Sequence, residues 1–273
     1  MITMNEIGLN GRLGNQMFQY AALLGIARKN NFKYGINYSN DFNLKLEDIP
    51  EDIHINQKIL TLSRLFKLSA EDSSHINLPT IAEPHLHFCE ELFQIKDNVN
   101  LHGYFQTEKY FNHIKKEIVL EYTFPEHLLA KAQVLLGPFL DKEIVSVHFR
   151  RSDYLNLKDY YNTDLDDYYK KAFQLFSGKK YTFLLFSDDL EYLIANFEGQ
   201  NKFKICKAKN QFLELALMSL CHHNIIANSS FSWWGAWLNQ NPNKKVIAPK
   251  DWFNFGYKQH DTKDIYCEGW IKI

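Results

Sequence analysis

The chain has 273 residues, of which 45% are apolar and 23% charged. This is enough for one large α/β domain or two smaller lobes, and it excludes a disordered protein. The 31 basic and 32 acidic residues leave a formal charge of −1, so the chain lacks the basic surface of a nucleic-acid-binding protein. Any anionic ligand must therefore meet a local cluster of hydrogen-bond donors.

The N-terminal half is weakly patterned. Its predicted elements are a strand at 6–9, a turn at 10–14, a helix at 15–29, a strand at 99–105 and a helix at 125–136. Residues 40–98 are polar and predict no clear elements. We expect an N-terminal lobe of residues 1–122 and a C-terminal lobe of residues 123–273.

The C-terminal half alternates short β-branched or aromatic runs with apolar segments of helical spacing. The predicted strands are 144–149, 181–186, 203–206, 224–227 and 245–248, and the predicted helices are 164–176, 190–197, 211–221 and 229–237. This alternation predicts an α/β fold with a parallel sheet and right-handed crossovers. The tryptophans of the last helix, Trp233, Trp234 and Trp237, are expected to pack in the core.

The cysteines and the N-terminal sequence indicate the compartment. Cys89, Cys206, Cys221 and Cys267 form no CxxC pair and no zinc spacing, so we expect free thiols. The N-terminus lacks the basic start and apolar stretch of a signal peptide, and no apolar run approaches the roughly 20 residues that cross a bilayer. We expect a cytoplasmic protein without a transmembrane segment, at most peripheral to the inner face of the cytoplasmic membrane.

Polar clusters follow three of the predicted strands, at 148–153, 187–189 and 228–230. In parallel sheets ligands bind beyond the carboxyl ends of the strands, so we expect all three clusters at one edge. Two guanidiniums leaving a buried strand, Arg150 and Arg151, need partners. Phosphate oxygens match their planar geometry, and so does a salt bridge to the nearby Asp153.

The other motifs each have two interpretations. Gly11 and Gly14 form either a tight turn or an anion site at a helix N-terminus. The clusters at 187–189 and 228–230 either cap the helices that follow them or contact a nucleotide. His222-His223 is expected to stabilise the C-terminus of the preceding helix.

Metal sites are disfavoured. Asp164-Leu-Asp166 matches the DxD pattern of metal-dependent sugar transferases, but it opens a predicted helix, where acidic residues favour the dipole. His85 and His87 with Glu90 lack a clear further ligand. We therefore expect no metal.

Four blocks of the chain resemble the signature blocks of the bacterial α-1,2-fucosyltransferases. They are GRLGNQMFQYA (11–21), HFRRSDY (148–154), FSDD (186–189) and NSSFSWWGAWL (228–238), in the family's order. The first block is also similar to protein O-fucosyltransferases and α-1,6-fucosyltransferases. Ser152 stands where the family commonly has glycine.

The resemblance implies a GT-B-like α/β fold with two Rossmann-like lobes facing a central cleft. It places the acceptor on the side of the N-terminal lobe, residues 1–122, and GDP-fucose mostly on the C-terminal lobe, residues 123–273. It also implies inverting, metal-independent transfer of L-fucose from GDP-β-L-fucose to the 2-hydroxyl of a terminal β-galactoside, without a cofactor. The expected donor-binding residues are Gly11, Gly14, Asn15, His148, Arg150, Arg151, Asp188, Asn228, Ser229, Ser230 and Phe231.

Within this site the expected roles differ. Arg150 replaces a metal ion at the departing diphosphate, Arg151 shares that task or orients Asp153, and Asp153 is the candidate base. The alternatives are a fucosyltransferase of α-1,6 or O-fucosyl linkage, a metal-dependent transferase using Asp164 and Asp166, and a non-catalytic glycan- or nucleotide-binding protein.

Overall fold

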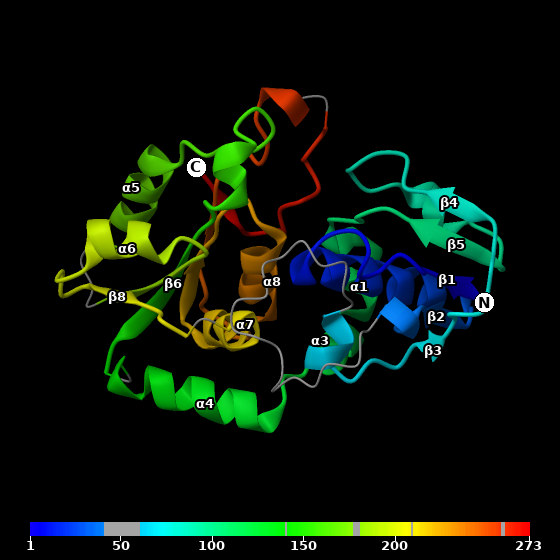
Figure 1. Cartoon of the computed structure of the whole chain (residues 1–273), viewed down its shortest axis with the longest axis horizontal. Coiled ribbons are helices and arrows are strands. Elements are labelled where there is room, and N and C mark those ends of the chain that lie inside the picture. The colour runs from blue at the N-terminus through cyan, green and yellow to red at the C-terminus, as the bar shows by residue number, and fades with distance from the viewer. Residues whose placement is uncertain (41–60, 140, 177–180, 209, 258–259) are drawn as a thin grey trace. The chain divides into compact units, whose positions relative to one another are not determined.

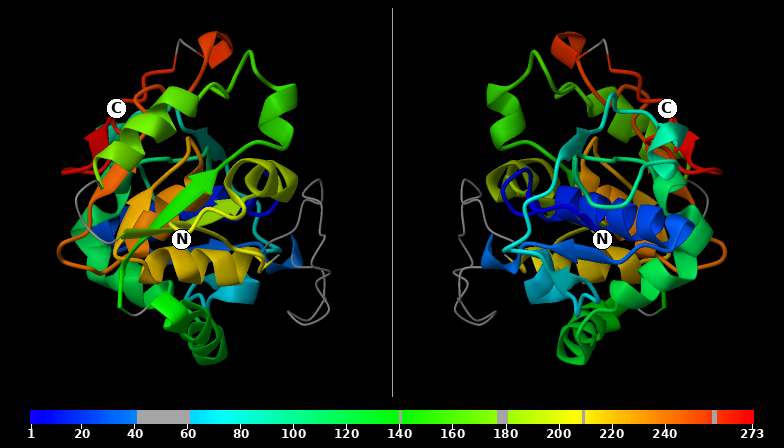
Figure 2. Two further views of the ribbon diagram at one scale, coloured as in Figure 1. Left: turned by 90° about the vertical axis from the view of Figure 1, so that its left-hand side faces the viewer. Right: turned by 90° about the vertical axis from the view of Figure 1, so that its right-hand side faces the viewer.

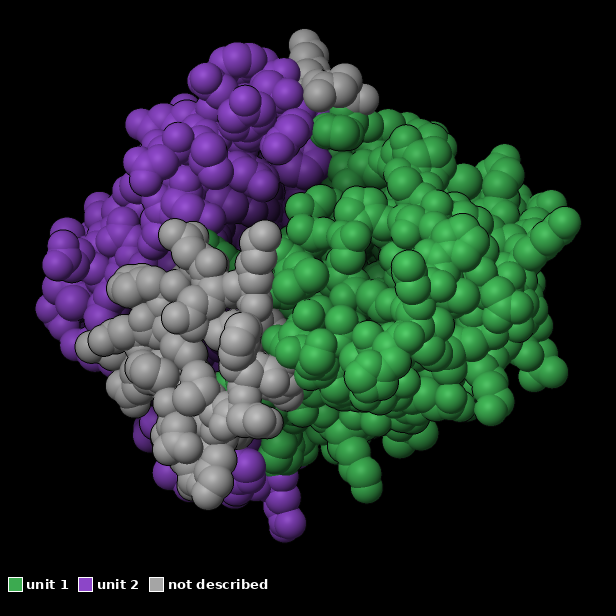
Figure 3. Space-filling view, turned by 45° about the vertical axis from the view of Figure 1, so that its right-hand side comes forward, with its two compact units in different colours: residues 1–125, 260–267 green, residues 126–259, 268–273 purple. Residues whose placement is uncertain are grey.

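The computed structural model describes residues 1–40, 61–139, 141–176, 181–208, 210–257 and 260–273. The chain forms two compact units, coloured separately in Figure 3: Met1–Pro125 with His260–Cys267, and Glu126–Gln259 with Glu268–Ile273. The segment 260–267 belongs to the first unit, where the Asp264 carboxylate accepts hydrogen bonds from Phe88 N–H (3.0 Å) and Lys109 Nζ (2.6 Å). The expected division at 122/123 had placed this segment with the C-terminal lobe.

The first unit contains a five-stranded parallel sheet of order β3-β2-β1-β5-β4. Its strands are β1 (Ile2–Thr3), β2 (Tyr34–Ile36), β3 (Glu71–Asp72), β4 (Thr80–Ala82) and β5 (Val99–His102). The strand predicted at 6–9 is wrong, because turn hydrogen bonds join Ile7 N–H to the Met4 carbonyl and Leu9 N–H to the Glu6 carbonyl. The strand predicted at 99–105 is confirmed for residues Val99–His102, which form β5.

The helices of the first unit are α1 (Leu13–Asn30), α2 (Leu62–Leu65) and α3 (Lys115–Glu121), with 3₁₀ turns η1 (Tyr38–Asn40), η3 (Glu90–Phe93), η4 (Glu108–Tyr110) and η5 (Asn112–Ile114). Helix α1 confirms the prediction at 15–29. It is buried along most of its length and lies beside the sheet, as the right-hand view of Figure 2 shows. It ends at Asn31, whose left-handed backbone (φ 55°) closes the last turn.

The second unit contains a six-stranded parallel sheet of order β11-β10-β9-β6-β7-β8. Its strands are β6 (Glu143–Phe149), β7 (Tyr181–Ser187), β8 (Phe203–Ile205), β9 (His223–Ile225), β10 (Val246–Ala248) and β11 (Ile271–Lys272). The parallel sheet and five of these strands confirm the sequence prediction, whereas β11 was not predicted. The register pairs Phe149 with Ser187, so β6 and β7 end side by side.

Helices cover both faces of the second sheet. They are α4 (Glu126–Leu136), α5 (Asp166–Gln174), α6 (Leu190–Phe197), α7 (Gln211–Leu220) and α8 (Ser230–Leu238), with 3₁₀ turns η6 (Gly137–Phe139), η7 (Asp153–Asn156) and η8 (Phe255–Tyr257). In Figure 1, α5 and α6 lie on one side and α7 and α8 on the other. Val145 and Val147 pack in one core cluster with Tyr168 of α5 and Leu193 of α6. Trp233, Trp234 and Trp237 of α8 are buried, as predicted.

Two further predictions can be compared with the structure. The four cysteines are free thiols, as expected. His222 and His223 directly follow α7, which ends at Leu220, and the chain then enters β9. His222 Nδ1 accepts a hydrogen bond from Ile144 N–H (3.0 Å), and His223 Nδ1 accepts one from Lys245 N–H (3.0 Å). In the described part of the chain, no helix is long and apolar enough to cross a membrane.

The close approach of α1 to η4 predicts a large effect of one methyl group. A Cβ at Gly25 would lie 2.0 Å from the Tyr110 carbonyl oxygen, so one of the two backbones must move. We expect Gly25→Ala to lower the free energy of unfolding by about 3 kcal/mol in urea titrations. The matched control is Gly137→Ala, whose Cβ would have no atom within 4 Å. Equal stability of the two variants would contradict the packing described here.

Candidate active site at the strand ends of the second sheet

The three polar clusters predicted at strand ends meet at one edge of the second sheet. Arg151 N–H donates to Asp188 Oδ1 (2.9 Å), and Ser152 Oγ donates to the Asp188 carbonyl (2.8 Å). These bonds join the end of β6 to the end of β7. Tyr154 Oη donates to the Asn228 carbonyl (3.3 Å), which joins the same loop to the end of β9. The predicted common edge is therefore confirmed.

Arg150 lies between two carboxylates. Its Nη1 is 2.5 Å from Asp188 Oδ2, and its Nη2 is 2.5 Å from Asp153 Oδ1. The side chains of Arg150 and Asp188 are 12% and 15% exposed, whereas that of Asp153 is 40% exposed. The salt bridge that the sequence left open is thus present. Asp188 is the shielded partner of Arg150, and Asp153 is the partner that solvent or a ligand can reach.

Arg151 is held differently. Its Nε is 3.1 Å from Asp189 Oδ2, and its guanidinium lies 3.7 Å from the centre of the Tyr192 ring. Asp189 also caps α6, since its Oδ1 accepts a hydrogen bond from Tyr192 N–H (3.0 Å). The cap predicted at 187–189 is confirmed at Asp189. The expectation that Arg151 orients Asp153 is corrected, because the partner observed for Asp153 is Arg150.

Two buried polar atoms at this edge of the sheet have no hydrogen-bond partner among the described residues: His148 Nδ1 and Asn228 Oδ1. Burial and the neighbouring Arg150 lower the pKa of His148 to about 3, so the imidazole is neutral at physiological pH. An unpaired buried polar atom costs about 1–3 kcal/mol. Such atoms at a sheet edge indicate a place where a ligand completes the hydrogen bonding.

The N-terminus of α8 belongs to the same edge. Ser229 occupies the cap position, but its side chain makes no capping hydrogen bond, so the predicted cap is not formed there. Ser230 and Phe231 form the first turn, whose N–H groups carry partial positive charge. The Phe231 ring lies 5.8 Å from the His148 ring.

The glycine block lies in the first unit. Gly11 has φ 86°, and a Cβ there would lie 2.5 Å from Asn15 Nδ2, so the turn requires glycine. Asn15 Oδ1 accepts a hydrogen bond from Gln106 Nε2 (2.8 Å). Gly14 is buried in the first turn of α1. The structural interpretation of this block is therefore supported by direct contacts.

Two carboxyl groups were missed by the sequence analysis. Glu83 Oε2 accepts hydrogen bonds from Tyr104 N–H and Phe105 N–H (both 2.9 Å), and burial raises its pKa to about 7. Burial, with a smaller contribution from Asp188, raises the pKa of Glu214 in α7 to about 7. Glu83 lies in the unpatterned region 40–98, so nothing in the sequence marks it. Glu214 could have been noticed as the single charge within an apolar helix.

The DxD sequence lies at a helix start, as expected. Asp164 is exposed and its N–H bonds to Asn162 Oδ1 (3.2 Å), while Asp166 is in the first turn of α5. The rings of His85 and His87 stack on each other, 3.5 Å apart. Within the described ranges, no group of three or more His, Cys, Asp or Glu side chains is arranged to hold a metal ion.

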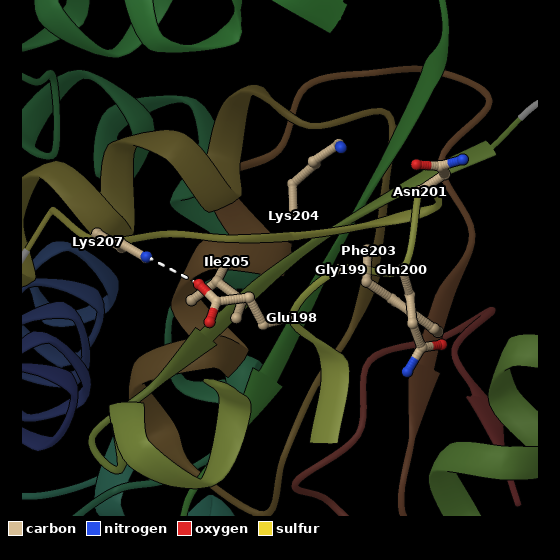
Figure 4. A pocket seen from close by; sticks show the side chains of 8 residues that line it. All are labelled: Glu198, Gly199, Gln200, Asn201, Phe203, Lys204, Ile205 and Lys207. Carbon is tan, nitrogen blue, oxygen red and sulfur yellow. Dashed lines mark hydrogen bonds and ion pairs between the residues drawn. The ribbon is translucent and has the colours of Figure 1, made fainter. Parts of the chain in front are cut away.

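A surface pocket of about 280 Å³ lies along the edge strand β8 and is shown in Figure 4. Its lining consists of residues 198–201, 203–205 and 207, and an ion pair joins Lys207 Nζ to Glu198 Oε1 (3.2 Å). None of the predicted site residues lines this pocket. We therefore place the candidate site at the strand ends, where the unpaired atoms of His148 and Asn228 and the ion pairs of Arg150 and Arg151 lie.

Comparison with known proteins identifies the family of the chain. The model of the family described as glycosyl transferase family 11 matches residues 1–273. The chain is 30% identical over 298 residues to an alpha-1,2-colitosyltransferase of Escherichia coli, covering 97% of both chains. It is 28% identical to the O-antigen biosynthesis glycosyltransferase WbnK of the same species, covering 97% of this chain and 99% of the relative. The human galactoside alpha-(1,2)-fucosyltransferase 1 is 26% identical, covering 84% and 64% of the two chains.

Solved structures share the fold. The NodZ alpha-1,6-fucosyltransferase soaked with GDP-fucose superposes with a TM-score of 0.55 at 13% identity, covering 87% of this chain and 91% of that one. POFUT1 in complex with GDP-fucose gives a TM-score of 0.50 at 13% identity, covering 90% and 96%. The resemblance to fucosyltransferases is confirmed, and the protein is a glycosyltransferase with parallel α/β sheets.

The pairing of Arg150 predicts unequal roles for its two carboxylates in stability. Removing a shielded partner leaves a buried charge, so we expect Asp188→Asn to lower the free energy of unfolding by about 3 kcal/mol. Asp153→Asn, at the exposed partner, should cost less than about 1 kcal/mol. Urea titration of both variants tests this. A larger loss for Asp153→Asn would refute the assignment of Asp188 as the structural partner.

Glu83 predicts a pH dependence of stability. Its pKa is about 7 in the folded chain against an ordinary 4.5, so between these pH values the folded state holds a proton that the unfolded chain has released. The free energy of unfolding therefore falls as pH rises from 5 to 8. In Glu83→Gln this contribution is absent, and stability relative to wild type should rise by up to about 3 kcal/mol over that range.

The control for this measurement is Glu90→Gln, which changes an exposed carboxylate. Because the pKa of Glu214 is also raised, Glu214 makes the free energy of unfolding fall with pH as well, and this contribution is the same in both variants. Urea titrations at pH 5 and pH 8 give the change in the free energy of unfolding with pH for each protein. Parallel pH profiles for Glu83→Gln and wild type would show that Glu83 is ionised at neutral pH.

Proposed function

Because the chain belongs to glycosyl transferase family 11, we propose that it is a galactoside α-1,2-fucosyltransferase. It transfers L-fucose from GDP-β-L-fucose to the 2-hydroxyl of a terminal β-galactoside, with inversion at the sugar carbon. The α-1,2 linkage named for its relatives supports this choice over the α-1,6 and O-fucosyl linkages. Each compact unit forms one Rossmann-like lobe of the proposed GT-B-like fold.

The observation that carries the proposal is the position of Arg150 at the strand ends, with one shielded and one exposed carboxylate. Departure of GDP leaves negative charge on the diphosphate, which needs a fixed cationic donor. An oxygen of the β-phosphate replaces Asp153 on Nη2, while Asp188 keeps its hold on Nη1. The phosphate oxygen and the carboxylate that it replaces are both negatively charged, so the buried guanidinium keeps an anionic partner throughout.

The neighbouring groups complete the donor site. Ser229, Ser230 and the N–H of Phe231 hold the diphosphate at the N-terminus of α8. The unpaired atoms of His148 and Asn228 contact the nucleotide, which satisfies their hydrogen bonding. Both oxygens of Asp188 are engaged by Arg150 and by Arg151 N–H, so we assign it to positioning Arg150. The donor contacts expected for Gly11, Gly14 and Asn15 stay a prediction.

Asp153 becomes the base when the diphosphate displaces it from Arg150. The acceptor 2-hydroxyl transfers its proton to the Asp153 carboxylate as its oxygen bonds to C1 of fucose. The bond between C1 and the β-phosphate oxygen breaks, and GDP leaves with the electron pair. The reaction uses no metal and no cofactor in this proposal, and it takes place in the cytoplasm.

One relative favours a second donor. The E. coli alpha-1,2-colitosyltransferase is as similar to this chain as any relative described above. Colitose is L-fucose without its 3-hydroxyl, so the same ionic groups serve either GDP-sugar. Comparing kcat/KM for GDP-fucose and GDP-colitose distinguishes the two donors, and a preference above about tenfold decides between them.

Arg150 gives the decisive test. With GDP-fucose and lactose or N-acetyllactosamine, wild type should form an α-1,2-linked product, identified by linkage analysis, at a rate unaffected by EDTA. Arg150→Lys keeps the charge but loses the planar pair of donors, so kcat should fall on the order of 100-fold. Arg151→Lys, at the neighbouring guanidinium held by Asp189 and Tyr192, should reduce kcat far less.

Three results would overturn parts of this proposal. Loss of activity with EDTA, restored by Mn²⁺, would favour a metal-dependent mechanism through Asp164 and Asp166. Near-normal kcat in Arg150→Lys would remove Arg150 from the transition state. Binding of GDP-fucose without release of GDP, in the presence of every galactoside acceptor, would leave a non-catalytic binding protein.

A further inference from the structure

Two loops of the second unit carry a cluster of aromatic rings that the proposed donor site does not use. We call Tyr154, Tyr160, Tyr161, Phe253 and Tyr257 the aromatic cluster. Tyr154 stacks on Tyr161 with ring centres 3.9 Å apart and planes inclined by 10°. Tyr257 contacts Tyr160 (4.8 Å), Phe253 (5.3 Å) and Tyr161 (6.1 Å). The rings thus form one continuous surface across both loops.

Backbone contacts fix the two loops to each other. Residues Tyr161 and Phe253 form an isolated antiparallel bridge. Asn254 N–H donates to the Tyr160 carbonyl (2.8 Å), and Gly256 N–H donates to the Asp159 carbonyl (2.6 Å). A Cβ at Gly256 would lie 2.7 Å from that same carbonyl oxygen, so the loops approach as closely as glycine allows. These backbone contacts therefore fix the loops that carry the aromatic cluster without the help of a ligand.

The aromatic cluster is continuous with the candidate active site. Asn228 Nδ2 donates to the carbonyls of Asn162 (3.1 Å) and Trp252 (2.9 Å), which flank the two loops. The Arg150 guanidinium lies 5.1 Å from the centre of the Tyr154 ring. One asparagine after β9 thus anchors both loops, and ring contacts lead from Arg150 through Tyr154 to Tyr161.

The same two loops also carry exposed apolar side chains. Phe255, at the start of η8, is 64% exposed, Tyr160 is 42% exposed and Leu157 is 40% exposed. Exposed Lys158 and Asp159 lie beside them in the chain. A stable protein partner needs roughly 20 residues on each side, far more than this patch offers. Flat rings bordered by hydrogen-bonding groups suit a pyranose, which has C–H faces and hydroxyl edges.

We infer that Phe255 and Tyr160 form a subsite for the acceptor glycan, where a sugar ring of the acceptor stacks next to the donor site. This inference rests on the proposed function for the nature of its ligand. The binding energy of the stacked ring holds the reacting galactoside against Arg150 and Asp153. The subsite acts on acceptor binding and takes no part in breaking the bond to GDP.

The test compares Phe255→Ala and Tyr160→Ala with wild type in steady-state kinetics. The KM for the acceptor should rise about tenfold in each variant, corresponding to the loss of one ring contact. The kcat at saturating acceptor, the KM for GDP-fucose and the slow release of GDP without acceptor should stay unchanged. Phe255→Trp and Tyr160→Phe keep a ring and should retain the wild-type KM.

Leu175→Ala is the matched control, since Leu175 is an exposed apolar side chain (44%) of the same unit at the end of α5. Thermal unfolding of Phe255→Ala should match wild type, because the Phe255 ring is 64% exposed. Tyr160→Ala also loses the ring contact with Tyr257, so its kinetics are measured well below its unfolding midpoint. An unchanged acceptor KM in Phe255→Ala and Tyr160→Ala overturns the inference. A rise in the KM for GDP-fucose instead assigns the rings to the nucleotide, and a change in oligomeric state assigns them to a second copy of the chain.

Failure of this inference can be told apart from failure of the proposed function. Wild-type protein that transfers fucose to a β-galactoside, together with alanine variants of unchanged acceptor KM, refutes the subsite alone. Wild-type protein that transfers fucose to no β-galactoside refutes the proposed function and the subsite with it. Saturation-transfer NMR with lactose, free of donor, gives a readout of the subsite that does not depend on turnover.

Discussion

The contact between Asp188 and the first residues after β6 organises the candidate site. A single carboxylate holds the Arg150 guanidinium with one oxygen and the Arg151 backbone N–H with the other. The guanidinium leaves a buried strand, where an unpaired charge would be costly, so the chain must supply a partner within reach. Asp188 reaches it because β6 and β7 are hydrogen-bonded neighbours that end in register.

In the proposed mechanism, this pairing lets a protein with a formal charge of −1 bind a diphosphate. In the described structure three carboxylates surround two guanidiniums, so the edge carries no surplus of positive charge. Affinity for an anion then arises from exchange: Asp153, the exposed carboxylate, gives up its place on Arg150. Such a site binds an anion only if the anion fits the hydrogen-bonding geometry of the Arg150 guanidinium. This requirement gives specificity, and it does not depend on long-range electrostatic attraction.

The two parts of the site differ in how they are held. Arg150, His148 and Asn228 lie at the ends of buried strands, and their positions follow from the sheet. The aromatic cluster lies on loops that are fixed by their own backbone bonds and by Asn228. The proposed roles follow this difference, since the sheet edge carries the groups for the chemistry and the loops carry the rings that recognise the glycan.

Patterns that depend on neighbours in the chain were predictable. The alternation of strands and helices after residue 140, the helix at Leu13–Asn30 and the cap at Asp189 follow from spacing and local hydrogen bonding. The first strand was misplaced because a two-residue strand leaves no periodic signal, and its identity comes from pairing with β2 and β5. Glu83 was missed because its hydrogen bonds are made with the backbone at 104–105, about twenty residues away in the chain.

The amino-acid sequence alone therefore determined the α/β class, the family and the residue types gathered at three strand ends. Only the tertiary structure decided which carboxylate pairs with which guanidinium, and that Asn228 joins two loops into an aromatic surface. Composition and spacing describe contacts between residues close in the chain. Ion pairs and ring stacks between residues tens of positions apart depend on strand order and register, which one sequence does not specify.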